Sequence, residues 1–239
     1  MIPTARTWIE QAQSITILTG AGVSAESGIP TFRGDGGLWR NYRAEDLATP
    51  EAFARDPNLV WEWYGWRREL IAKAEPNAGH HAIARLQRRV RNCTLITQNV
   101  DGLHDRAGSF GILKIHGDIW RLRCTACGSE WPDHRVPLPK IPPRCQCGGL
   151  ARPGVVWFGE DLPPGVWRSA VDAASSSDVF LVAGTSAVVY PAASLIPHAK
   201  SGGARVIEAN PDETPATRAA DLSIRGRSGE VLPQLVTTG

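Results

Sequence analysis

Four cysteines lie in two close pairs in the middle of the chain. Cys124 and Cys127 have Cys-x2-Cys spacing. After 17 intervening residues come Cys145 and Cys147, which are separated by a single residue. Two tight turns that each present two thiolates can ligate one ion, and four thiolates leave no coordination position open. The pattern predicts a structural zinc ribbon; metal-free reduced thiols are the alternative. Cys93 stands alone before an apolar run and is expected to be a packed core thiol.

A glycine-rich turn follows a short β-branched strand near the start of the chain. Gly20 and Gly22 permit a tight turn and a close approach of backbone N–H groups to a ligand. Ser24 and Ala25 are expected to open a helix whose N-terminus favours a phosphate. Strand, Gly-x-Gly turn and helix together predict a dinucleotide site. The glycine-rich loop of residues 33–39 after it predicts a mobile cover over a cofactor, with Phe32 and Arg33 pointing into the pocket. A plain surface loop is the alternative.

Polar residues follow each of the other apolar runs. Gln98-Asn99-Val100-Asp101 follows residues 94–97, and His116 follows residues 112–115. Gly184-Thr185-Ser186 follows residues 179–183, and Asn210-Pro211-Asp212 follows residues 205–209. Ligands bind at the carboxyl edge of open parallel sheets, so we expect these turns to converge on one cleft. An imidazole at that edge titrates in the range that a general base needs.

Apolar strands alternate with helical stretches, which predicts an α/β fold with a mostly parallel sheet. Helices are expected at residues 4–13, within 44–73, from a start within 76–81 through Arg91, and from 230 to 235, with Thr49 and Asp56 as N-caps before prolines. The 239 residues carry a net charge of +2, too small to imply a nucleic-acid partner. No stretch has the length of a membrane span or the apolar core of a secretory signal, so we expect a cytoplasmic protein without a membrane partner.

In identity, order and spacing, these motifs resemble those of the sirtuins, NAD-dependent protein-lysine deacylases, over about residues 15–235. The resemblance implies a Rossmann-like domain of residues 1–34, 76–117 and 153–239. It also implies a small domain made of a helical insertion, residues 35–75, and a zinc ribbon, residues 118–152. NAD, structural zinc and an acyl-lysine protein or peptide are the implied cofactors and partner, with nicotinamide, O-acyl-ADP-ribose and free lysine as products.

The resemblance also implies roles for single residues. His116 is the expected catalytic base, Gln98 and Asn99 hold the nicotinamide ribose, and Asp101 binds the carboxamide of nicotinamide. Ser228 occupies a cofactor position where alanine is more usual in the family. The full set of expected cofactor-binding residues is Gly20, Ala21, Gly22, Ser24, Glu26, Thr31, Phe32, Arg33, Asp35, Trp39, Gln98, Asn99, Val100, Asp101, Gly184, Thr185, Ser186, Asn210, Pro211, Asp212 and Ser228.

Tyr64 and Arg67 lie at i and i+3, on one face of a predicted helix. A guanidinium fork with a phenol suits a carboxylate. The pair is similar to the Tyr-x-x-Arg signature of class III sirtuins, which implies succinyl-, malonyl- or glutaryl-lysine substrates, and we expect deacetylation as well. The alternative is an amphipathic helix with a solvated Arg67; Arg68 is expected to be solvated.

Three other functions remain open on this sequence. A non-catalytic NAD sensor would need the glycine turn but not His116. An NAD hydrolase or ADP-ribosyltransferase would use the same pocket with another nucleophile. A nucleic-acid-binding zinc ribbon is the least favoured, because the segment around the cysteines lacks a dense basic face.

Overall fold

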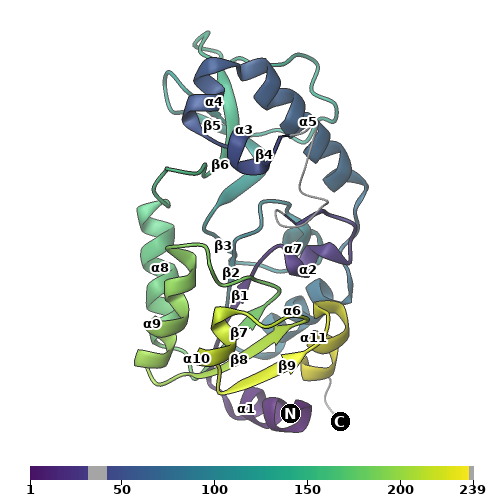
Figure 1. Cartoon of the computed structure of the whole chain (residues 1–239), viewed down its shortest axis with the longest axis vertical. Coiled ribbons are helices and arrows are strands. Elements are labelled where there is room, and N and C mark those ends of the chain that lie inside the picture. Colours follow the sequence, from purple (N-terminus) through teal and green to yellow (C-terminus); the bar gives the residue numbers. More distant parts are fainter. Residues whose placement is uncertain (32–41, 237–239) are drawn as a thin grey trace.

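In the computed structural model, which describes residues 1–31 and 42–236, a six-stranded parallel sheet forms the larger part of the molecule (Figure 1). Its strand order is β3-β2-β1-β7-β8-β9. The strands are β1 (Ser14–Thr19), β2 (Asn92–Thr97), β3 (Leu113–Lys114), β7 (Val179–Ala183), β8 (Arg205–Asn210) and β9 (Leu222–Arg225). The order reverses between β1 and β7, which is where doubly wound sheets open a ligand crevice. The predicted α/β class and parallel sheet are confirmed.

Helices cover both faces of this sheet, as the nearly continuous apolar strands require. One face carries α1 (Ile2–Gln11), α6 (Ala78–Arg89) and α11 (Ser228–Val236), which bury side chains such as Ile9, Leu86 and Leu232. The other carries α8 (Pro164–Ser175), η2 (Ala192–Ser194), α9 (Leu195–Ser201) and α10 (Pro215–Ala219). The short helices α2 (Gly22–Ala25) and α7 (Leu103–Arg106) lie at the carboxyl edge of β1 and β2.

A second, smaller layer stands above that edge (Figure 1). It is an antiparallel sheet, β5-β4-β6, of β5 (Glu130–Pro132), β4 (Gly117–Cys124) and β6 (Ala151–Val155). Helices α3 (Ala44–Leu47), α4 (Pro50–Arg55) and α5 (Pro57–Lys73) pack on it through one apolar cluster. The indole Nε1 of Trp61 donates to the Ala151 carbonyl at 2.8 Å, which ties α5 to β6. Thr49 and Asp56 cap α4 and α5 as predicted.

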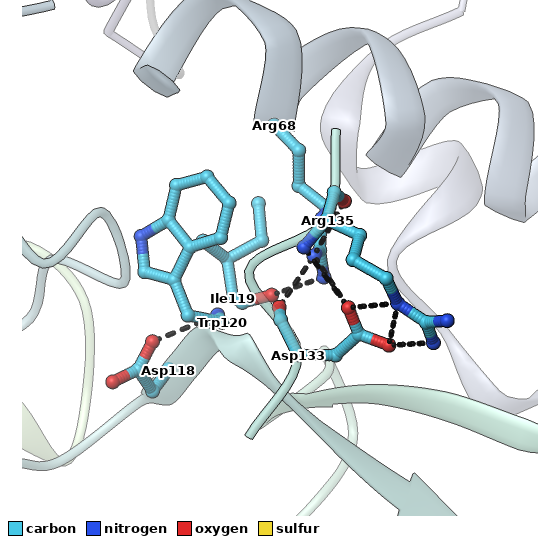
Figure 2. A network of polar contacts seen from close by, with 6 residues as sticks. All are labelled: Arg68, Asp118, Ile119, Trp120, Asp133 and Arg135. Atoms are coloured by element: carbon cyan, nitrogen blue, oxygen red, sulfur yellow. Dashed lines mark hydrogen bonds and ion pairs between the residues drawn. The ribbon is translucent and has the colours of Figure 1, made fainter. Parts of the chain in front are cut away.

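The prediction that Arg68 is solvated is wrong. Its side chain is 1% exposed and crosses from α5 to the antiparallel sheet (Figure 2). The guanidinium donates to the carbonyls of Ile119, Asp133 and Arg135, and its Cζ lies 4.9 Å from the ring centroid of Trp120. A buried cation is tolerated where protein groups replace the water that it loses. Here three backbone carbonyls accept from the terminal nitrogens and the Asp133 carboxylate lies 3.8 Å away, while Nε has no hydrogen-bond partner among the described residues. Helix α5 is therefore buried on more than one side.

The sheets meet where β4 and β6 begin to pair, at Gly117 and Val155. The predicted boundary at residue 117 falls on the first residue of β4, and the one before 153 falls inside β6. We propose the predicted division of the chain, with this antiparallel pair as the connection between the two domains. Within residues 1–31 and 42–236, no helix combines the length and the apolar character needed to cross a membrane.

Candidate active site

The glycine turn after β1 packs directly against the turn after β7. The Gly22 N–H donates to the Gly184 carbonyl at 2.8 Å, and the Gly20 N–H donates to the Ala183 carbonyl. A Cβ on Gly22 would lie 2.7 Å from the Gly184 oxygen, closer than a side chain can approach. The two N–H groups predicted to face a ligand therefore bond to β7 and its turn, and the glycines are required by backbone packing. Helix α2 starts at Gly22, two residues before the predicted start.

Three buried polar side chains, those of His80, Asn99 and Asp101, converge on the hydroxyl of Ser24. Nδ1 of His80 accepts from the Asn77 backbone N–H, so the neutral imidazole carries its proton on Nε2, 3.3 Å from Ser24 Oγ. Asn99 Nδ2 also donates to that oxygen, at 3.1 Å. With two donors on its oxygen, Ser24 directs its own proton to Asp101 Oδ2, 2.8 Å away. The hydrogen bonds thus run in one direction, toward the Asp101 carboxyl group.

Asp101 has two separate roles in this network. Its Oδ1 accepts from the Leu103 N–H at 2.8 Å and so caps α7, while Oδ2 accepts from Ser24. Burial raises the pKa of Asp101, and the hydrogen bonds from Leu103 and Ser24 and the charge of Arg67 oppose that shift. Trp120 Nε1 donates to the Asp101 carbonyl at 2.7 Å, which links this residue to the antiparallel sheet.

His116 lies at the end of β3, beside the turn after β2. Its Nδ1 is 3.1 Å from the Gln98 carbonyl. A carbonyl only accepts, so Nδ1 carries the proton and Nε2 presents a lone pair. Burial lowers the pKa of His116, so the imidazole is neutral at neutral pH.

Gln98 Nε2 donates to Thr185 Oγ1 at 2.9 Å, and Asn210 Nδ2 donates to the Thr185 carbonyl at 2.7 Å. The carboxyl ends of β2, β3, β7 and β8 are joined in this way.

Arg67 reaches this edge from α5. It is 9% exposed and lines a cavity of about 10 Å³, the size of one water molecule, together with Ala21, Ser24, Ile29, Pro30, Asn99, Val100 and Asp101. Its Cζ lies 5.4 Å from the ring centroid of Trp63. Tyr64, one turn earlier, is buried, and its hydroxyl accepts from Trp157 Nε1 at 2.9 Å. Burial raises the pKa of Tyr64, so the phenol keeps its proton.

Other expected cofactor residues lie at the margin of this cluster. Glu26 is exposed, and its carboxylate accepts from the Gly229 N–H at 2.7 Å, beside Ser228. Ser228 Oγ is buried and has no hydrogen-bond partner among the described residues, which fits a ligand atom at that point. Pro211 and Asp212 are exposed, and Ser186 and Thr31 are half-buried. Phe32, Arg33, Asp35 and Trp39 lie outside the described residues.

The four cysteines of the second sheet form one cluster. All four Sγ atoms lie within 4.8 Å of one another, with Cys124 and Cys147 3.5 Å apart and Cys127 and Cys145 3.7 Å apart. A tetrahedral zinc with Zn–S bonds near 2.3 Å separates its sulfurs by about 3.8 Å. The donor set and its spacing therefore fit zinc, despite the shorter Cys-x-Cys half. Cys93 is partly buried against the main core, and burial raises its pKa to about 12.

Some residues of the site have no counterpart in the sequence prediction. His80 appears in the sequence only as part of a helix start, and Trp157 only as part of an apolar stretch before Gly159. Both bond to predicted site residues, Ser24 and Tyr64 respectively. Histidine or tryptophan beside apolar residues is common in cores, so no pattern in the sequence distinguishes them.

A doubly wound sheet with an imidazole and buried amides at the carboxyl edge of its strands, beside a four-thiolate ribbon, defines an enzyme that handles a dinucleotide. The sequence pattern of the Sir2 family matches residues 20–191, and the chain belongs to this family.

The comparisons with individual proteins agree over nearly the whole chain. An NAD-dependent protein deacylase of Aquifex aeolicus is 55% identical over 223 residues, which cover 93% of each chain. A Sir2 homologue in complex with NAD superposes with a TM-score of 0.94 at 52% identity, over 98% of this chain and 92% of that one. A Sir2 homologue mutant in complex with 2′-O-acetyl-ADP-ribose gives the same TM-score and identity, over 99% and 95%. The expected family and fold are confirmed.

Proposed function

We propose that this NAD-dependent protein deacylase of the Sir2 family removes succinyl and malonyl groups from lysine side chains, and acetyl groups as well. Its products are nicotinamide, O-acyl-ADP-ribose and free lysine. The observation that carries the acyl preference is the placement of Arg67: a buried guanidinium lines the same cavity as Asn99 and Asp101. The acetylated product in the homologous complex supports the deacetylase part.

NAD supplies, when bound, the ribosyl carbon to which the acyl oxygen is transferred as nicotinamide leaves. We assign its pyrophosphate and adenosine to the turns after β1, β7 and β8 and to the region of Glu26 and Ser228. The Ser24, Asn99 and Asp101 network holds the nicotinamide end. Ser24 donates its proton to Asp101, so the direction of each hydrogen bond in the network is set before a ligand binds. This lowers the free-energy cost of orienting the ligand.

His116 is proposed as the general base. The Nδ1 proton bonds to the Gln98 carbonyl, so Nε2 is unprotonated and has a lone pair available. Nε2 can therefore accept a proton from a ribose hydroxyl, and the hydroxyl oxygen then attacks the acyl carbon. The proton leaves the hydroxyl oxygen and is held on Nε2. The pKa lowered by burial keeps this nitrogen free at neutral pH. Four thiolates close the coordination sphere of the zinc, so its proposed role is structural.

Tyr64 and Arg67 are the proposed acyl-recognition pair. Burial lowers the pKa of Arg67, while Tyr64 and Asp101 oppose this shift, and arginine keeps its charge at neutral pH. A buried cation gains more from an anionic acyl end than an exposed one does, because water screens it less. The pair therefore favours acyl groups that end in a carboxylate.

The test compares acyl peptides in one assay. We expect Arg67→Met to lower kcat/KM for a succinyl-lysine peptide by about 100-fold, as loss of a buried charged hydrogen bond costs 1.5–3 kcal/mol or more, with the acetyl-lysine rate within about threefold of wild type. Arg55→Met, at an exposed arginine of α4, is the matched control. Equal loss on both peptides would remove the assignment.

Peptide dependence separates this function from the two other NAD chemistries. Nicotinamide released only when an acyl-lysine peptide is present supports the deacylase. Release without peptide would favour an NAD hydrolase, and NAD binding without any release would favour a sensor.

A further inference from the structure

Trp157 follows β6 directly and is almost completely buried, with 3% of its surface exposed. Its indole lies between the antiparallel sheet and α5, with Phe53 of α4 at 5.3 Å between ring centroids. Its one polar side-chain atom, Nε1, donates to the hydroxyl of Tyr64 at 2.9 Å. Both partners of this hydrogen bond are buried, so water does not compete for it.

This hydrogen bond restricts what Tyr64 can do. A phenol oxygen carries one proton and two lone pairs, and an indole N–H can only donate. Tyr64 Oη must therefore accept from Trp157, and its own proton is directed away from the indole. Tyr64 keeps that proton at neutral pH, because burial raises its pKa. The hydroxyl is thus a donor whose direction is set by Trp157.

The indole is itself held on several sides. The guanidinium of Arg152 stacks on it, with Cζ 3.3 Å from the ring centroid. Arg152 is paired with Glu160, whose Oε2 also accepts from the Trp157 backbone N–H at 2.8 Å. Phe158 N donates to the Ala48 carbonyl at 2.9 Å, which attaches the segment to the end of α3. Trp157 is therefore placed independently of Tyr64.

We propose that Trp157 is a positioning residue for acyl selectivity, whose indole N–H turns the Tyr64 hydroxyl so that it donates to the terminal carboxylate of an acyl group bound by Arg67. The inference rests on the proposed function. It extends the recognition pair of α5 by a residue on a different element, 93 positions further along the chain.

The consequence differs between acyl groups. An acetyl group has no terminal acceptor, so the orientation of the Tyr64 proton does not affect its binding. A succinyl group loses a hydrogen bond when that orientation is lost, while the chemistry at His116 is unchanged. Loss of the indole N–H should therefore raise KM for carboxylated acyl groups and leave kcat and the acetyl reaction in place.

Trp157→Phe keeps an aromatic ring and removes the donor. We expect it to raise KM for a succinyl-lysine peptide about three- to tenfold, the range for a neutral hydrogen bond, with kcat and both acetyl parameters within about twofold. Trp157→Met, which lacks the donor in a different shape, should give the same selective change. Melting temperature and acetyl turnover report whether each variant is folded.

Tyr64→Phe and the double variant complete the test. If Trp157 acts through the Tyr64 hydroxyl, the double variant should be no worse on the succinyl peptide than Tyr64→Phe alone. Additive losses, or equal losses on both peptides, would overturn the inference while an effect of Arg67→Met confined to the succinyl peptide leaves the proposed function standing. An unchanged succinyl rate in Arg67→Met would overturn both.

Discussion

The imidazole rings of His80 and His104 lie against each other below the glycine turn, with centroids 4.8 Å apart and planes inclined by 58°. Both side chains are excluded from water. Burial lowers the pKa of His80 to about 4 and that of His104 to about 3. The charge of His81 adds to the shift of His80, and the charges of His80 and Lys114 add to the shift of His104. The folded protein therefore holds two neutral histidines that the unfolded chain protonates below pH 6.5.

Because of this pair, we expect the free energy of unfolding to decrease as the pH is lowered from 7 to 5. In this range the unfolded state binds more protons than the folded state. Each histidine should therefore lower the free energy of unfolding by about 2 kcal/mol at pH 5, relative to its value above pH 6.5. Asp101, whose pKa is raised, acts in the opposite direction. Urea unfolding of wild type and of a His80→Gln, His104→Gln variant measures the slopes. The variant should be less pH-dependent, and a His198→Gln control should match wild type; identical slopes in all three would contradict the prediction.

Replacement of Arg68 predicts a large loss of stability without a direct effect on chemistry. Arg68→Met leaves the carbonyls of Ile119, Asp133 and Arg135 without their buried donor (Figure 2). We expect the free energy of unfolding to fall by about 3 kcal/mol. Arg135→Met, whose side chain is 64% exposed, should cost about 1 kcal/mol or less. Equal effects of the two variants in urea unfolding would show that the buried hydrogen bonds are not the cause.

Removal of the metal predicts loss of the folded ribbon. Metal analysis of the purified protein should find a single zinc per chain, bound by the four clustered cysteines. Chelation should lower the melting temperature, and added zinc should restore it, because binding energy at such a site is folding energy. Cys127→Ser should lose the zinc and Cys93→Ala should retain it. Full zinc content in Cys127→Ser would contradict the assigned ligand set.

His116 predicts an acid limb in the pH profile. Activity needs the neutral imidazole, so kcat/KM should fall as pH decreases, with an apparent pKa below 6.5 because burial lowers the pKa of His116. His116→Ala should reduce peptide turnover by about 100-fold or more while NAD binding, followed by calorimetry, persists. Turnover that continues unchanged in this variant would exclude His116 as the base.

Much of the parallel sheet could be predicted from the sequence. The run at 179–183 has five apolar residues and forms β7 with the predicted bounds, because a strand buried on both faces shows no alternation. Thr49 and Asp56 were recognisable as N-caps, because an acceptor side chain is preferred at the N-cap and proline is preferred at the first position of the helix. β3 is two residues shorter than predicted, because only Leu113 and Lys114 pair with β2.

The candidate site was less predictable where its partners are backbone groups. Arg68 donates to three backbone carbonyls. Every residue has a backbone carbonyl, so the sequence does not show which of them will accept from an arginine. Gly22 was expected to admit a ligand, but its neighbour is the Gly184 carbonyl, 162 residues away. The roles of Trp157 and His80 likewise depend on one hydrogen bond each to a distant residue. Such contacts exist only after folding and leave no local pattern.

Helix α5 places consecutive arginines on two different surfaces, Arg67 toward the cavity beside Asp101 and Arg68 toward the antiparallel sheet. About 100° of rotation separates neighbouring residues on a helix. Inserting or deleting one residue in this helix would therefore rotate the face that carries Arg67 and the face that carries Arg68 together. Evolution can exchange side chains at either face, but it cannot adjust the register of one without displacing the other.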